Sequence, residues 1–123
     1  MLDASALLAL ILGEAGADVV ASHLEGAAIS AVNLAEVGAK MVDRGATLDF
    51  VHREIAAAEV VVVPFDTAQA FESARLRPLT RDYGLSLGDR ACLALGATMN
   101  RLVLMTDRDW TPVGLPVDIR LIR

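Results

Sequence analysis

The chain has 123 residues, of which 54% are apolar and 22% charged, with a formal net charge of −5. We expect a single domain over residues 1–123, because this length is typical of one domain and the apolar fraction excludes a disordered chain. The longest strongly apolar run, residues 6–12, is too short to span a membrane, and the acidic balance argues against capture of nucleic acid through bulk positive charge.

Helical patterns alternate with short β-branched runs along the chain. We expect helices at residues 4–12, 17–24, 32–44, 47 or 48–58, 66 or 67–76 and 86–99. We expect an extended segment at Leu2, strands at 28–31, 60–63, 102–105 and 118–121, and a turn at 112–115. The runs at 60–63 and 102–105 are apolar throughout, which is typical of strands buried on both faces. This order predicts an α/β sandwich with a mostly parallel sheet.

A single cysteine, Cys92, excludes an internal disulfide framework and favours a reducing, cytoplasmic location. Since Cys92 falls on an apolar helix, we expect a buried thiol rather than a nucleophile. No basic segment precedes the apolar run near the N-terminus, so we expect no secretory leader.

Four acidic residues follow the predicted strands or lie early in the helices after them: Asp3, Glu36, Asp89 and Asp107. The carboxyl ends of parallel strands share one edge of a sheet, where ligands bind in such folds. Carboxylates crowded at that edge would raise one another's pKa unless a cation offsets their charge. Oxygen ligands select hard ions such as Mg²⁺ or Mn²⁺, which can activate water and hold a phosphodiester.

Each of these acids also has an ordinary structural interpretation. Asp3 is a good N-cap for the helix that follows it, and Asp89 completes a capping-box pattern. Glu36 has the spacing for an ion pair with Lys40. Asp107 fits an ordinary turn.

Other chemistries have less support. His23 and His52 lack partners at metal-ligand spacing, so a zinc site is not expected. No glycine-rich phosphate loop is present, and the serines have no base nearby in sequence. Trp110 is better interpreted as a packing anchor than as a contact for a base.

Four segments, in order, resemble the motifs of the PIN domain, in particular of VapC-type toxins of bacterial toxin–antitoxin pairs. They are residues 2–10 (LDASALLAL), 33–37 (NLAEV), 85–95 (LSLGDRACLAL) and 104–110 (LMTDRDW). Together they extend over nearly the whole chain, from residue 2 to about 110.

The resemblance implies a three-layer α/β/α sandwich around a parallel sheet of about five strands. It implies an Mg²⁺- or Mn²⁺-dependent endoribonuclease, inhibited by a cognate antitoxin. Asp3, Asp89 and Asp107 would hold the metal, and Glu36 would be a further ligand or orient the attacking water. Ser5 and Thr106 match hydroxyl positions at the edge of the site, and Asp109 is an alternative or auxiliary acid. The apolar, low-aromatic composition also favours a surface for an antitoxin helix or a homodimer, with the first helices and residues 48–58 as candidates.

Substrate contacts could come from arginines, which are ten of the eleven basic residues. Arg75, Arg77 and Arg81 form the densest group, with ion pairing to Glu72 or Asp82 as the ordinary interpretation. Arg90 and Arg108 directly follow two of the site acids.

Two other functions are compatible with the sequence. The acids of a catalytically silent module could bind a basic partner segment instead of a metal. Receiver-type or phosphatase chemistry at Asp3 is disfavoured, because no second acid stands two residues on and the lone lysine, Lys40, lies in a predicted helix.

The first strand is a departure from the family pattern. Only Met1 and Leu2 precede Asp3, whereas relatives generally have a few more apolar residues there. Either this strand is very short, or the native chain begins further upstream.

Overall fold

The structure is a computed structural model that describes residues 1–110 and 114–123, without the side chain of Asp109. Its helices are α1 (Ala4–Leu12), α2 (Ala17–Ala21), α3 (Ala31–Asp43), α4 (Leu48–Ala58), α5 (Thr67–Arg75), α6 (Arg77–Thr80) and α7 (Leu87–Met99). Short 3-10 turns follow at η1 (Arg81–Tyr83) and η2 (Arg108–Trp110). The strands are β1 (Ala28–Ser30), β2 (Val61–Val63), β3 (Val103–Met105) and β4 (Ile119–Leu121). These bounds agree with the sequence-based elements to within about three residues. The sequence did not predict α6, and the first half of the predicted turn, residues 112–113, lies outside the described residues.

The strands form two parallel pairs, β1 with β2 and β3 with β4. Leu2 joins the pairs through parallel bridges to Ile29 and Leu104. The Leu2 amide donates to the carbonyl of Ala28 at 2.9 Å, and the Leu104 amide donates to that of Met1 at 2.8 Å. The expected sheet of about five strands is therefore confirmed only in part. Among the described residues there are four short strands, and the N-terminal position between them is a single-residue bridge.

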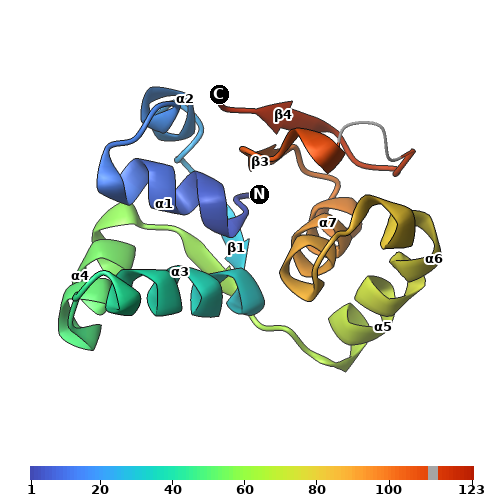
Figure 1. Cartoon of the computed structure of the whole chain (residues 1–123), viewed down its shortest axis with the longest axis horizontal. Coiled ribbons are helices and arrows are strands. Elements are labelled where there is room, and N and C mark those ends of the chain that lie inside the picture. The colour runs from blue at the N-terminus through green and yellow to red at the C-terminus, as the bar shows by residue number, and fades with distance from the viewer. Residues whose placement is uncertain (111–113) are drawn as a thin grey trace.

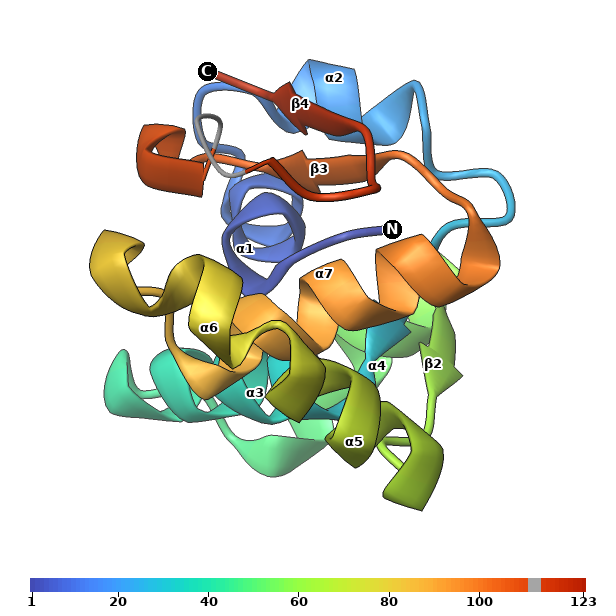
Figure 2. The ribbon, with the colours of Figure 1, turned by 90° about the vertical axis from the view of Figure 1, so that its right-hand side faces the viewer.

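Alternating side chains of the central segments enter two separate hydrophobic cores. Leu2, Ile29 and Leu104 face one core, shared with α1 to α4, whereas their chain neighbours Ala28 and Val103 face the other core, shared with α7. This alternation follows from the period of two in extended chain. Figure 1 shows α1 to α4 on one side and α5 to α7 on the other, and Figure 2 shows α5 and α6 in front of α7. The predicted α/β fold, with helices on two sides of short parallel strands, is confirmed.

One burial prediction is wrong. The run at 60–63 does not lie in a strand buried on both faces, because Val61 is 56% exposed and Val62 37% exposed. The physical reason is position: within the described residues β2 pairs only with β1, so it is an edge strand, which tolerates solvent on its open side. By contrast, all three residues of β3 are buried, as expected.

Side-chain caps set the starts of the helices that follow the strands. Ser30 caps α3 and Ser86 caps α7, while Asp3 caps α1 directly after the Leu2 bridge. A side-chain cap satisfies amides of the first turn, which otherwise have no intrahelical partner. Within the described part of the chain, no helix combines the length and apolarity needed to cross a membrane.

Candidate active site

Asp3 is a buried carboxylate, with only 6% of the residue exposed, at the end of the N-terminal bridge segment. Its Oδ1 accepts a hydrogen bond from the amide of Ala6 at 2.7 Å, so the predicted N-cap is confirmed. The hydroxyl of Ser5 lies 2.7 Å from both carboxylate oxygens and also accepts from the amide of Thr106 at 3.1 Å. Ser5 therefore ties the start of α1 to the end of β3.

Asp89 lies in the first turn of α7 and completes the predicted capping box. Its Oδ2 accepts from the amide of Ser86 at 2.7 Å, and its own amide donates to the Ser86 hydroxyl at 3.2 Å. The cap occupies only Oδ2 of Asp89. Among the described residues, no donor contacts its Oδ1. Capping and ligand binding are therefore compatible at this residue.

Glu36 is held by a buried amide and not by the lysine that the sequence pattern suggested. The side-chain amide of Asn33 donates to Oε2 of Glu36 at 3.3 Å and to the carbonyl of Gly88 at 3.0 Å. Between the described residues, no ion pair joins Glu36 to Lys40. A Cβ on Gly88 would lie 2.6 Å from Cδ of Glu36, so the carboxylate fits only against a glycine.

The four predicted acids line one cavity of about 250 Å³, which we call the acidic pocket. Ser5, Asn33, Lys40, Ser86, Thr106 and Trp110 also line it. The acids come from four separate segments: the N-terminus, α3, α7 and the loop after β3. Asp107 is exposed at the mouth, whereas Glu36 and Asp89 are half-buried. The predicted auxiliary acid Asp109 has its side chain outside the described part of the structure.

The electrostatics of Asp3 reflect burial and neighbouring negative charge. Burial raises the pKa of Asp3 from 3.8 to about 6, against the opposing effect of the hydrogen bonds from Ala6 and Ser5. Asp89 and Glu36 raise this pKa further, which shows that the three carboxylates interact. Burial also raises the pKa of the Cys92 thiol well above its usual value, as expected for an inert buried cysteine.

The residues of the acidic pocket fit a hydrated hard cation better than a dry metal cluster. No three Asp, Glu, His or Cys side chains converge closely enough within the described residues to form a preassembled metal site. However, Mg²⁺ usually keeps several waters and binds through only one or two carboxylates, which the volume and the all-oxygen acids allow. Asn33 and Trp110 line the cavity, and the buried Oδ1 of Asn33 and Nε1 of Trp110 have no hydrogen-bond partner among the described residues.

The predicted arginines lie in different environments. Arg75 pairs with Glu72 at 2.9 Å on the surface, which is the ordinary interpretation of that residue. Arg77 and Arg81 are exposed on α6 and η1. The Nη1 atom of Arg90 donates to the carbonyl of Leu85 at 3.1 Å, so Arg90 supports the loop before α7. Arg108 is exposed in η2 beside Asp107.

Two functional candidates were missed in the sequence. Asn33 was noticed only as part of a motif, although its position three residues before Glu36 puts both on one helix face. The sequence pattern offers Lys40 as a partner for Glu36 and disfavours it for phosphatase chemistry, whereas in the structure Lys40 lines the acidic pocket. The spacing of Asn33, Glu36 and Lys40 along one face of α3 is the signal that could have found them.

Comparisons with known proteins identify the family and the fold of the chain. The model of the PIN domain family matches residues 1–114. The crystal structure of VapBC2 from Rickettsia felis bound to a DNA fragment from its promoter has a similar fold, with a TM-score of 0.75 at 16% identity over 98% of this chain and 96% of that one. VapBC-5 from Mycobacterium tuberculosis, a member of the VapBC family of toxin–antitoxin systems, is 28% identical over 78% of this chain and 80% of that one, with a TM-score of 0.51. A comparison with curated proteins finds no match.

The fold is layered, with acids at one edge of its parallel strands, and the model of the PIN domain family matches most of the chain. The chain belongs to the PIN domain family.

Proposed function

We propose that this chain is a VapC-type toxin, an Mg²⁺- or Mn²⁺-dependent endoribonuclease that hydrolyses RNA phosphodiester bonds. The observation that carries the proposal is the acidic pocket, in which Asp3, Glu36, Asp89 and Asp107 meet from four segments. Membership of the PIN family and similarity to the VapBC structures support the same assignment.

Three of the acids would hold the ion, namely Asp3, Asp89 and Asp107, directly or through water. When bound, the ion would supply a polarised water and positive charge at the scissile phosphate. Ser5 holds the Asp3 carboxylate through hydrogen bonds of 2.7 Å, and these favour its charged form.

Glu36 either adds a further ligand or orients the attacking water. Asn33 fixes Oε2 of Glu36, while no donor among the described residues contacts Oε1. Oε1 can therefore accept a hydrogen bond, and then the proton, from a water in the pocket. The two roles share one requirement, which is that Asn33 and Gly88 keep the carboxylate in place.

Cleavage of total RNA by the purified chain tests the proposal. We expect cleavage with Mg²⁺ or Mn²⁺, none with a chelator, and a loss of about a hundredfold or more in Asp89→Asn. The asparagine keeps an oxygen for the Ser86 cap. Asp66→Asn is the control, because the carboxylate of Asp66 also accepts from an amide at the start of a helix, that of Gln69 at 2.9 Å, and does not line the acidic pocket.

Two results would contradict the assignment. Metal-independent cleavage would indicate another chemistry or a contaminating nuclease. Cleavage that is equal in Asp89→Asn and wild type would exclude the acidic pocket as the active site. A chain that binds a basic partner but never cleaves RNA would favour the silent interaction module instead. Sequencing the ends of RNA cut after brief induction would identify the substrate.

We also propose that a cognate antitoxin inhibits the chain. Exposed apolar side chains on neighbouring helices α3 and α4 support a helical partner: Val42 is 43% exposed, Leu48 65% and Phe50 41%. Co-purification from the native operon should recover a small neighbouring protein, and adding that protein should abolish cleavage. Recovery of the chain without any stable partner would count against this proposal.

A homodimer is the second assembly that we propose. Apolar side chains are exposed on helices of the other side of the molecule, including Phe71 on α5 at 72% and Leu87 on α7 at 51%. Sedimentation of the purified chain should give twice the monomer mass, and Phe71→Glu should lower it. A monomer at all concentrations would contradict the proposal.

A further inference from the structure

A second cavity, of about 550 Å³, opens beside the acidic pocket and has a different charge. We call it the basic pocket, because its lining includes three cations, Lys40, Arg44 and Arg123, against the two acids Glu14 and Asp43. Ser5, Lys40 and Thr106 line both cavities, so the two are contiguous. The floor includes Leu8 of α1.

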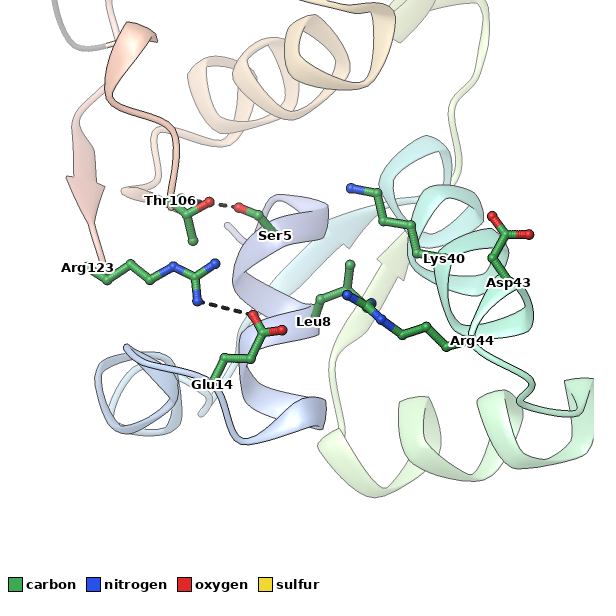
Figure 3. A pocket seen from close by; sticks show the side chains of 8 residues that line it. All are labelled: Ser5, Leu8, Glu14, Lys40, Asp43, Arg44, Thr106 and Arg123. Atoms are coloured by element: carbon green, nitrogen blue, oxygen red, sulfur yellow. Dashed lines mark hydrogen bonds and ion pairs between the residues drawn. The ribbon is translucent and has the colours of Figure 1, made fainter.

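The cations of the basic pocket approach it from two walls. Figure 3 shows Lys40 and Arg44 reaching in from α3, with Arg123 opposite them at the C-terminal end. Lys40 and Arg44 follow Glu36 at intervals of four residues, so one face of α3 carries an acid for the first pocket and then two cations for the second.

Two of the three cations have no anionic partner in the part of the chain that is described. Arg123 pairs with Glu14 at 3.1 Å, which fixes its position in the wall. No ion pair or hydrogen bond engages the charged groups of Lys40 and Arg44 among the described residues, and both are exposed. Asp43 also lines the cavity, but its carboxylate points away from Lys40 in Figure 3.

Unpaired cations next to a crowd of carboxylates indicate an anionic ligand that extends across both pockets. A phosphodiester strand has this character, because a phosphate at the acidic pocket is followed along the strand by further phosphates. We propose that the basic pocket binds backbone phosphates of the RNA strand next to the scissile phosphate, through Lys40 and Arg44. The proposal rests on the proposed function for the identity of the strand as RNA.

Binding of phosphates in the basic pocket would explain how an acidic chain can hold RNA. A chain of net charge −5 with four acids at its candidate site does not attract RNA through its overall charge. Local cations beside the acids would hold the strand without bulk positive charge. Such contacts position the backbone and are indifferent to sequence, so they supply affinity rather than sequence preference.

The salt dependence of RNA binding tests the proposal. The probe is a short fluorescent oligouridylate, and its anisotropy with the full chain is measured in a chelator over a range of salt, so that cleavage does not intervene. Removing one phosphate contact to a single strand lowers the slope of log K against log salt by about 0.7. We expect Lys40→Gln/Arg44→Gln to weaken binding and lower the slope by roughly 1.4, and Lys40→Arg to retain binding.

Arg53→Gln is the matched control for Arg44→Gln, because Arg53 is exposed on α4 and lines neither pocket. Circular dichroism checks that each variant folds. A slope that falls equally in Arg53→Gln and Arg44→Gln, or a wild-type chain that does not bind oligouridylate at low salt, would overturn the proposal.

An acidic peptide is the second probe, since a protein segment could also satisfy the two cations. If Lys40→Gln/Arg44→Gln lost binding of oligoglutamate but kept that of oligouridylate, the pocket would belong to a protein partner and the proposal would be wrong. Cleavage is not measured in this assay. The binding result can therefore be interpreted even if the chain does not cleave RNA. In the same way, cleavage can be established even if the basic pocket does not bind phosphates.

Discussion

The acidic and basic pockets share a wall but differ in how the fold holds their charges. In the acidic pocket, capping bonds and a buried amide fix three carboxylates, and Asp3 is almost fully buried. In the basic pocket, Lys40 and Arg44 are exposed, and no described residue holds their charged groups. This difference matches the proposed roles, because groups that carry out chemistry must be held in place, whereas groups that only attract a nucleic-acid backbone can keep their freedom.

This difference gives the two pockets different energetic signatures. Charges buried close together oppose folding until a proton or a cation offsets them, so substitutions in the acidic pocket change stability as well as activity. Substitutions of exposed cations change stability little and act mainly on binding.

The largest expected effect on stability is its dependence on pH through Asp3. The pKa of Asp3 is about 6 in the folded chain against an ordinary 3.8, so the folded chain binds this proton more tightly than the unfolded chain. The stabilisation by the proton is complete below pH 3.8 and is lost as the pH rises to about 6, a change of about 3 kcal/mol. Urea unfolding in a chelator should show this loss in wild type, and it should be absent from Asp3→Asn. The same pH profile in both proteins would contradict the raised pKa of the buried Asp3 carboxyl.

Addition of Mg²⁺ at neutral pH should offset the loss of stability that the charged Asp3 carboxylate causes. An ion that binds only the folded chain stabilises it by about 2.7 kcal/mol at a hundred times its Kd. Thermal unfolding should therefore shift upward with Mg²⁺ in wild type and much less in Asp89→Asn, with sodium at matched ionic strength as the control. Equal shifts in the two proteins would place the ion elsewhere.

Gly88→Ala should disturb the acidic pocket through Glu36. The added Cβ overlaps that carboxylate, which ends a flexible side chain and can move away, so we expect reduced cleavage and a loss of stability of no more than about 1 kcal/mol. In a Glu36→Ala background the same change should cost less, because the overlapping group is gone. Gly38→Ala is the control, since its Cβ would meet only Cγ1 of Val51 at 4.0 Å. Equal costs of Gly88→Ala in both backgrounds would argue against the contact.

Ser5→Ala should have the smallest effect. The hydroxyl of Ser5 donates to Asp3 and accepts from the amide of Thr106, so its removal should cost about 1 kcal/mol and raise the pKa of Asp3 further. Urea unfolding and an NMR titration of the Asp3 carboxyl measure the two effects. Ser22→Ala is the control, because Ser22 is exposed and its hydroxyl donates to the carbonyl of Val19. It should change neither the stability nor the pKa of Asp3. An unchanged pKa in Ser5→Ala would contradict the hydrogen bond.

Much of this fold could be predicted from local patterns, because caps and apolar runs act over a few residues. Asp3 and Asp89 were predictable both as caps and as site acids, and the structure shows that one carboxylate can serve as a cap and still face the pocket. The exposure of Val61 was not predictable, since an apolar run does not reveal which strand lies at the edge of the sheet.

The basic pocket also lay beyond sequence reasoning. Arg123 joins it from the far end of the chain, and only the tertiary fold brings that residue opposite Arg44. The ordinary interpretation of the spacing pairs Lys40 with Glu36, but Asn33 holds that carboxylate and leaves the lysine for the pocket. Local spacing correctly put Glu36 and Lys40 on one face, yet it could not decide between partners.

Steady-state cleavage kinetics most directly test the division of labour between the two pockets. The substrate would be an RNA identified from sequenced cleavage ends, assayed with Mg²⁺. We expect Asp89→Asn to lower kcat by about a hundredfold or more with little change in KM. Lys40→Gln/Arg44→Gln should raise KM and leave kcat nearly unchanged. A wild-type kcat in Asp89→Asn, or a KM unaffected by removal of both cations, would contradict the account.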